Sequence, residues 1–208
     1  FLDHIKNREP DVGAWIFLDP EMALQQAREA DKRRRDKSSG KLNGLPIGIK
    51  DIYECGPTTC GSESLASYIA DQDCTSVAKL KEAGAIILGK TATYEFAYGF
   101  PPTQSHFKPT RNPWSLDHDA GGSSSGTAAS TASGMAYAGM GSCTGGSIPW
   151  PAQACGIVGL KATYGRVSRA GVYPLSWSLD HTGPLARTVT DAALMLQGCA
   201  GYDPLDPA

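Results

Sequence analysis

The sequence lacks the features that mark membrane proteins, zinc proteins and nucleic-acid-binding proteins. None of its 208 residues belongs to an apolar run near the roughly 20 residues needed to cross a bilayer. Its formal net charge of -2 gives no basic excess for a nucleic acid or an acidic membrane surface. There are only four histidines, and none of the six cysteines forms a CxxC pair, so we expect neither a metal site nor a cofactor.

The six cysteines are expected to be reduced, mostly buried thiols. Hydrophobic residues make up 41% of the chain, enough to form a core without a disulfide framework. The chain begins FLDH and shows no signal-peptide pattern. We therefore expect a cytoplasmic protein, although Cys55 and Cys60 could pair in an oxidising compartment.

Helical and strand patterns alternate along the chain and predict an α/β fold. Asp19 and Pro20 suit the start of the first helix, and the alternation in LPIGIK makes Lys50 the last residue of a mostly apolar strand. A helix followed by a strand after a short glycine turn is typical of α/β domains. We expect a single domain over 1–208, with a helical lead-in at 1–40 and a catalytic core at 41–208. The expected elements are a helix at 19–36, a strand at 45–50, a helix at 75–84, a strand at 85–89, a proline-rich loop at 101–113 and a helix at 188–199.

A basic run, KRRR at 32–35, lies in the last turn of the first expected helix. Cations at that end interact favourably with the helix dipole. Aromatic residues do not interleave with the run, as they would in many nucleic-acid-binding patches. We interpret it as a solvated helix end and expect binding neither to nucleic acid nor to a membrane.

Residues 119–166 contain the densest group of candidate functional residues. Two glycine-flanked serine clusters, Gly121–Gly126 and Gly145–Ser147, are separated by small residues for which we expect a helix over 127–138. Glycine lets a loop bend sharply or approach a ligand closely, and serine supplies hydroxyl groups. A flexible Gly/Ser linker is the alternative. Apolar residues resume at once at Ile148 and Trp150, which favours a folded core.

The common phosphate and serine motifs fit these clusters poorly. Neither cluster matches the GxxxxGK[ST] phosphate loop. A GxSxG pattern surrounds Ser124, but His181 is the only histidine after the clusters, and the adjacent Asp180 is poorly placed to orient it. A lysine that burial keeps neutral can activate a serine instead. Lys50, at the end of its strand, is the candidate base.

Four segments resemble the amidase signature family: PIGIKD, GGSSSGTAAS, GSCTGGSIPWPAQACGIVGLKATYGRVSR and SLDHTGPLARTVTDAALML. They occur in the family's order, from about residue 44 to the C-terminus. The resemblance implies a mixed central sheet covered by helices on both faces, of which this chain holds the N-terminal portion. It also implies hydrolysis of an amide bond through an acyl-enzyme, by a Ser-cisSer-Lys triad that needs no cofactor.

The resemblance assigns a role to individual residues. Ser147 of TGGSI would be the nucleophile, Ser123 of GGSS would follow a cis peptide and relay protons, and Lys50 of PIGIKD would be the base. Backbone N–H groups of residues 144–147 would form the oxyanion hole, where preorganised donors stabilise the transition state. Contacts to the substrate or the oxyanion are accordingly expected from Thr144, Gly145, Gly146 and Ser124.

The sequence departs from the common family pattern near these motifs. Ser125 and Thr127 replace a glycine and a serine, Cys143 replaces an acid, and Pro149 replaces an arginine. Because the triad is intact, we expect an amidase acting on a small amide substrate. The alternatives are an impaired amidase-like subunit or scaffold, and an acyltransferase of the same fold. Family members are usually much longer, so we expect a homo-oligomer, or a second chain or segment that completes the fold.

Overall fold

The computed structural model describes residues 1–100 and 107–208. Its helices are α1 Leu2–Val12, α2 Pro20–Arg35, α3 Thr75–Glu82, α4 Ser125–Ala132, α5 Pro149–Cys155 and α6 Val189–Cys199. Its strands are β1 Trp15–Leu18, β2 Pro46–Lys50, β3 Ile86–Thr91, β4 Arg111–Asn112, β5 Ser115–Asp119, β6 Ala138–Cys143, β7 Val158–Gly159 and β8 His181–Ala186. Part of the loop expected at 101–113 lies outside the described residues, and the part that is described contains β4.

The described strands form a six-stranded mixed sheet in the order β1-β3-β2-β6-β8-β7, and β4 and β5 form a separate hairpin. Strand β2 runs parallel to both β3 and β6, whereas β1 and β8 pair antiparallel with the strands beside them. The carboxyl ends of β2 and β6 therefore meet at one edge of the sheet, where Lys50 and Cys143 are their last residues. The mixed central sheet implied by the resemblance is confirmed.

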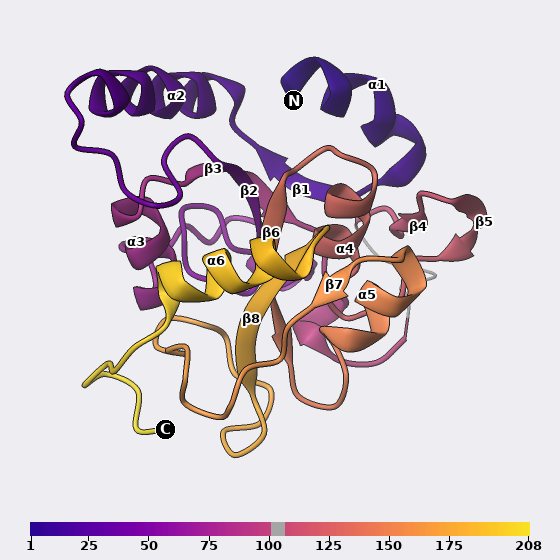
Figure 1. The fold of residues 1–208 in the computed structure, drawn as a ribbon. Helices are drawn as coiled ribbons and strands as arrows, with labels where there is room; N and C mark the ends of the chain where they lie inside the picture. Colours follow the sequence, from indigo (N-terminus) through magenta and orange to yellow (C-terminus); the bar gives the residue numbers. More distant parts are fainter. Residues whose placement is uncertain (101–106) are drawn as a thin grey trace.

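Helices cover both faces of this sheet (Figure 1). On one face, α3 and α6 pack over a core that includes Ile47, Ile49 and Met195. On the other face, α4 and α5 pack over a second core that includes Leu185 and Ile148. The expected α/β architecture with helices on both sides of the sheet is thus confirmed.

The helices and strands expected outside the serine clusters are present, and their ends differ from the expected ones by no more than two residues. The first of them starts as the sequence suggested, because the Asp19 carboxylate accepts a hydrogen bond from the Met22 backbone N–H at 2.9 Å. All six cysteines are free thiols, as expected, and Cys55 and Cys60 are not bonded to each other.

The helix expected over 127–138 is shorter than that range and begins earlier. It runs over Ser125–Ala132, and the chain then enters strand β6. The Ser133 hydroxyl bonds back to the Ala129 carbonyl at 2.6 Å, and Gly134 turns the chain with a φ of 76°. A strand so rich in glycine is disfavoured by propensity, but here close packing requires it: a Cβ on Gly139 would lie 2.6 Å from the Thr127 methyl group.

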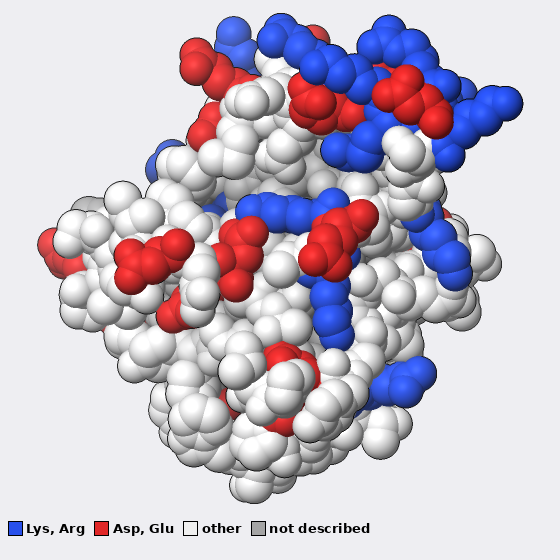
Figure 2. All heavy atoms as spheres, turned by 90° about the vertical axis from the view of Figure 1, so that its left-hand side faces the viewer, with Lys and Arg blue, Asp and Glu red and all other residues white. Residues whose placement is uncertain are grey.

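The basic run at the end of α2 lies among acidic side chains on the surface (Figure 2). Lys32 forms an ion pair with Glu29 one helical turn away, with a nitrogen–oxygen distance of 2.7 Å. Among the helices of the described residues, none has both the length and the hydropathy to cross a membrane. The described residues likewise hold no group of three His, Cys, Asp or Glu side chains that could bind a metal ion.

Candidate active site

Lys50 is fully buried at the carboxyl end of β2. Its Nζ lies 2.7 Å from the Ser123 Oγ and 2.8 Å from the Ser142 Oγ. The ordinary pKa of lysine, 10.5, falls to about 7 here, chiefly because burial penalises the charged form. Around neutral pH a large fraction of the amine is therefore unprotonated and able to accept a proton from a serine.

Ser123 reaches Lys50 from the loop that leads into α4. The peptide bond between Gly122 and Ser123 is cis, as the resemblance implied. Only glycine fits before it, because a Cβ on Gly122 would lie 2.2 Å from the Tyr94 ring. Tyr94 also donates its backbone N–H to the Ser123 carbonyl at 3.2 Å. Two contacts of one tyrosine thus fix the loop that carries Ser123.

Ser124 does not face a substrate site. Its side chain is fully buried, and its hydroxyl donates to the Ser142 carbonyl at 3.2 Å and accepts from the Ser142 N–H at 3.3 Å. The hydroxyl therefore joins the start of α4 to β6. This position corrects the assignment of Ser124 to substrate or oxyanion contact, because its hydrogen-bonding capacity is used inside the protein.

The second serine cluster forms an open loop between β6 and α5. Ser147 is partly exposed, and a Cβ on Gly145 or Gly146 would meet nothing within 4 Å. In the described part of the chain, no acceptor receives a hydrogen bond from the backbone N–H groups of Gly145, Gly146 or Ser147. The Ser147 hydroxyl is likewise not hydrogen-bonded to Ser123 or Lys50 in this structure. Free N–H groups on an open loop are what a forming oxyanion requires.

Thr144, at the start of this loop, is held by Asp180. The Thr144 hydroxyl donates to the Asp180 Oδ1 at 2.5 Å, and the Asp180 Oδ2 accepts from the N–H groups of Leu175 and Ser176 at 2.8 and 2.9 Å. The His181 ring instead contacts the Leu179 carbonyl and the Lys161 amine. Asp180 and His181 therefore do not form a catalytic relay, in agreement with the sequence argument.

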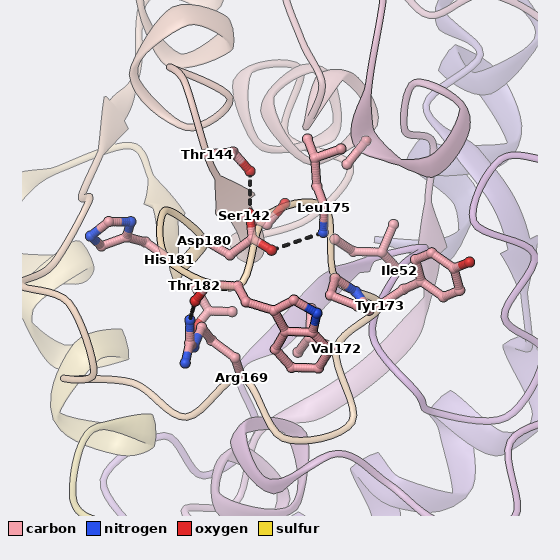
Figure 3. A pocket seen from close by; sticks show the side chains of 13 residues that line it. Ile52, Ser142, Thr144, Arg169, Val172, Tyr173, Leu175, Asp180, His181 and Thr182 are labelled. Carbon is pink, nitrogen blue, oxygen red and sulfur yellow. Dashed lines mark hydrogen bonds between the residues drawn. The ribbon is translucent and has the colours of Figure 1, made fainter. Parts of the chain in front are cut away.

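A pocket adjoins these groups at the carboxyl edge of the sheet (Figure 3). Ser142, Thr144 and Asp180 line it together with apolar side chains of the chain segment 172–177. Ser142 connects the pocket to Lys50, and Thr144 connects it to the loop that carries Ser147. Ser147 itself lies outside the lining.

The amidase family model matches residues 1–208. The chain belongs to the amidase family. It is 51% identical over 207 residues to a glutamyl-tRNA(Gln) amidotransferase subunit from Geobacter sp. (strain M21), a match that covers 99% of this chain and 43% of that protein. The corresponding subunit from Carboxydothermus hydrogenoformans is also 51% identical, with 98% and 43% covered. The chain thus spans less than half the length of these curated relatives.

Solved amidase structures share the fold. The peptide amidase of Stenotrophomonas maltophilia superposes with a TM-score of 0.92 at 41% identity, covering 99% of this chain and 44% of that one. The corresponding glutamyl-tRNA(Gln) amidotransferase subunit from Thermotoga maritima gives a TM-score of 0.87 at 40% identity, with 99% and 43% covered. These likenesses establish an amidase-type chain and leave its particular reaction open.

The departures of this chain from the common pattern have identifiable places in the structure. Pro149 is the first residue of α5, where proline costs no hydrogen bond. Cys143 is buried at the end of β6, directly opposite His181 in the strand register. Thr127 on α4 shares a hydrogen bond with Thr91 of β3, with an oxygen–oxygen distance of 2.7 Å. Ser125 is buried at the start of the same helix.

Sequence reasoning missed the roles of three residues in and around the site. Ser142 is the second hydroxyl on Lys50, and its place two residues before Thr144 in GSCTGGS was a visible signal. Asp180 comes from the segment just before β8, and no local signal could pair it with Thr144. Lys90 is a second buried lysine, which lies 3.2 Å from the Asp51 Oδ1.

Proposed function

We propose that this chain carries the catalytic residues of an amide-bond hydrolase that works through an acyl-enzyme on Ser147. The observation that carries the proposal is the buried contact, at 2.7 Å, between Ser123 and Lys50, a lysine whose pKa burial lowers to about 7. A lysine at the end of an apolar strand is then available as a base at neutral pH. Membership of the amidase family supports the same class of reaction.

In the proposed reaction, the Ser147 hydroxyl attacks the carbonyl carbon of an amide. Ser123 takes the proton of Ser147 and passes its own to Lys50, and the return transfer protonates the leaving amine. The free N–H groups of the 144–147 loop bind the oxyanion, where one such donor is worth roughly 3–4 kcal/mol. Water then attacks the acyl-enzyme by the same proton route. For this proton transfer, the Ser147 hydroxyl must come within hydrogen-bond distance of the Ser123 hydroxyl when the substrate is bound.

The test is the loss of turnover in Ser147→Ala, measured on a simple primary or aryl amide. We expect activity to fall to the background rate with an unchanged circular dichroism spectrum and melting temperature. Ser178→Ala is the matched control, because Ser178 is exposed and outside the site. Labelling by a fluorophosphonate, mapped by mass spectrometry, should fall on Ser147. Retention of more than a small fraction of activity in Ser147→Ala would contradict the assignment and move the nucleophile to Ser123.

A second candidate function is that of a subunit or scaffold, or of an acyl donor to a second acceptor. The observation that favours it is the similarity to proteins named as subunits of an amidotransferase, together with the 43% share of their length that this chain spans. We further propose that a second chain or segment completes the domain and that the protein is cytoplasmic. Light scattering after size-exclusion chromatography tests completion: a stable monomer of this chain with full amidase activity would refute it.

A further inference from the structure

We propose that Tyr94 and Asp119 are positioning residues, a pair that holds Ser123 in place for proton transfer. The inference rests on the proposed hydrolysis at Ser147 and gives a part in it to two residues outside the triad. Both residues act through the backbone of the loop over 119–124, and not on the reacting atoms.

A single oxygen atom of Asp119 joins the tyrosine to the start of this loop. Its Oδ1 accepts a hydrogen bond from the Tyr94 hydroxyl at 3.0 Å and another from the Gly121 backbone N–H at 2.6 Å. Hydrogen bonds to an ionised acceptor are stronger than those between neutral groups. Because Gly121 lies two residues before Ser123, the carboxylate restrains the chain just ahead of the serine.

Tyr94 contacts the next two residues of the same loop. A Cβ on Gly122 would lie 2.2 Å from its ring, and its backbone N–H donates to the Ser123 carbonyl at 3.2 Å. The Tyr94 side chain is 2% exposed. Burial and the negative charge of Asp119 raise the pKa of its hydroxyl, which therefore remains a donor in the neutral range. The pair thus contacts each of residues 121–123.

The tyrosine also lies against the helix that follows Ser147. Its ring meets the Trp150 ring edge to face, with the centroids 6.1 Å apart and the planes at 82°. Trp150 is the second residue of α5, and its backbone N–H donates to the Gly146 carbonyl at 2.9 Å. Tyr94 therefore contacts both the loop that carries Ser123 and the helical turn that follows the proposed nucleophile.

The β4–β5 hairpin fixes Asp119 independently of the tyrosine. Asp119 is the last residue of β5. In the same hairpin, the Asn112 side chain donates to the Ala154 carbonyl at 2.8 Å, and the Trp114 indole N–H donates to the Cys155 carbonyl at 2.7 Å. These carbonyl groups belong to the last turn of α5, where helices leave such groups without internal partners. The hairpin that carries the carboxylate is therefore anchored on α5.

The proposed reaction depends on this geometry. The Ser123 Oγ must stay close to the Lys50 Nζ, 2.7 Å away in the structure, and must also receive the proton of Ser147. A displacement of about 1 Å can lower a rate by on the order of 10²-fold. Loosening the pair should therefore slow proton transfer. It should not change the burial of Lys50, which sets the pH midpoint of the rate.

The test is Tyr94→Phe in the intact protein, a change that removes one hydroxyl and keeps the ring contacts. The rate at which a fluorophosphonate labels Ser147 should fall roughly ten-fold at its pH plateau, because Ser123 is less well placed. The pH midpoint should not move, and the melting temperature should change little. In amide turnover, kcat should fall while KM stays within about two-fold. An unchanged labelling rate, or a shifted midpoint, would overturn the proposal.

Variants of Asp119 test whether the two residues act as one unit. Asp119→Ala removes the acceptor of both hydrogen bonds, so labelling should slow at least as much as in Tyr94→Phe. Asp119→Asn keeps an oxygen that can accept both bonds and should recover most of the rate. The double variant Tyr94→Phe with Asp119→Ala should be no slower than Asp119→Ala alone, because partners in one hydrogen bond are not additive. Additive losses, or no recovery with asparagine, would contradict the pair.

Tyr137 provides a matched control, because its hydroxyl also donates to a carboxylate. The acceptor is the Asp191 Oδ1, at 3.1 Å. Tyr137 directly precedes β6, so it lies at the end of that strand opposite to Ser142. Tyr137→Phe removes the same kind of hydrogen bond away from the Ser123 loop and should leave labelling unchanged. Equal losses in Tyr94→Phe and Tyr137→Phe would contradict a specific role for the pair.

Amide hydrogen exchange over 119–126 measures the restraint on the loop without any reaction at Ser147. Exchange should rise in Tyr94→Phe and Asp119→Ala but not in Tyr137→Phe. If it does so while the unmodified protein neither labels at Ser147 nor hydrolyses amides, the hydrolase proposal fails and the restraint stands. If the unmodified protein reacts at Ser147 and the variants react equally fast, the hydrolase stands and the positioning role fails.

Discussion

Lys50 and Lys90 lie on the neighbouring parallel strands β2 and β3, and both side chains are buried, at 0% and 1% exposure. In the register of these strands Lys50 is opposite Thr91 and Lys90 is opposite Ile49, so the two side chains leave the sheet on opposite faces. Their partners differ in charge. Lys50 contacts hydroxyl groups at hydrogen-bond distance, whereas Lys90 lies 3.2 Å from the Asp51 carboxylate and donates to the Tyr53 carbonyl at 2.7 Å.

This difference separates a candidate base from a structural cation. A buried ammonium group without a carboxylate partner is destabilised relative to the amine. A close carboxylate attracts a buried ammonium group and offsets part of the cost of burying it. The Asp51 Oδ1 has no hydrogen bond of good geometry, so its contact with Lys90 is a close ion pair. We therefore expect two equally buried lysines to differ in role, because Lys90 has a carboxylate at ion-pair distance whereas Lys50 contacts two hydroxyl groups.

The largest effect that would test this comparison is loss of activity in Lys50→Met. Removing the base should lower kcat/KM by on the order of 10³-fold, the usual contribution of general base catalysis. Thermal stability should change little, because methionine fills the same buried space with no charge to desolvate. Steady-state kinetics and a melting curve give both numbers. If His181→Ala were equally damaging, the lysine would not be the base.

The matched change Lys90→Met should act on stability instead. It leaves Asp51 as an uncompensated buried charge, which costs roughly 3–5 kcal/mol. The melting temperature should fall by on the order of 10 °C, while kcat/KM well below the melting point stays within a few-fold of the unmodified protein. The double change Lys90→Met with Asp51→Leu should recover part of the loss. Inactivation without destabilisation would show that the two lysines are not distinct in role.

Sequence motifs predicted some contacts of the candidate site and missed others. Lys50 and Ser123 are assigned by PIGIKD and GGSS, and the structure brings their side chains into contact. The contact of Thr144 with Asp180 joins segments 36 residues apart in the chain, and depends on the antiparallel pairing of β6 with β8. That pairing was not predicted, because β6 is built from small residues that resemble a helix or loop. Tertiary packing overrode local propensity there.

The pH dependence of acylation sharpens the comparison further. Lys50 can accept a proton only as the neutral amine, so the rate should rise with pH and level off above its pKa of about 7. The rate at which a fluorophosphonate labels Ser147, measured between pH 5 and 9, depends on activation of the nucleophile and not on the later hydrolysis of an acyl-enzyme. In Lys50→Met the residual rate should lose this midpoint. A midpoint near 10 in the unmodified protein would mean that Lys50 is not desolvated as the structure indicates.

The smallest expected effect concerns Asp180, a carboxylate whose negative charge raises the pKa of Lys50. Burial lowers the pKa of Lys50, and Cys143, Asp180 and Cys60 oppose that shift by favouring the charged amine. Replacing the carboxylate in Asp180→Asn removes one opposing charge, so the pKa of Lys50 should fall and the midpoint of the rate should move to lower pH, by a fraction of a unit. The shift of the midpoint is measured from the rate of fluorophosphonate labelling between pH 5 and 9.

The control for this last change is Thr144→Val, which removes the hydroxyl that Asp180 holds at 2.5 Å but keeps the charge. It should lower the plateau rate, because the 144–147 loop loses an anchor, and leave the midpoint in place. Asp180→Asn should change the midpoint. Any change in its plateau rate would measure the loss of the anchor that Asp180 gives the 144–147 loop. If both variants move the midpoint equally, the effect comes from the loop and not from charge. If Asp180→Asn instead moves the midpoint to higher pH, Asp180 does not act on Lys50 as a negative charge. The contrast between Lys50 and Lys90 would then not be explained by the distance of a carboxylate alone.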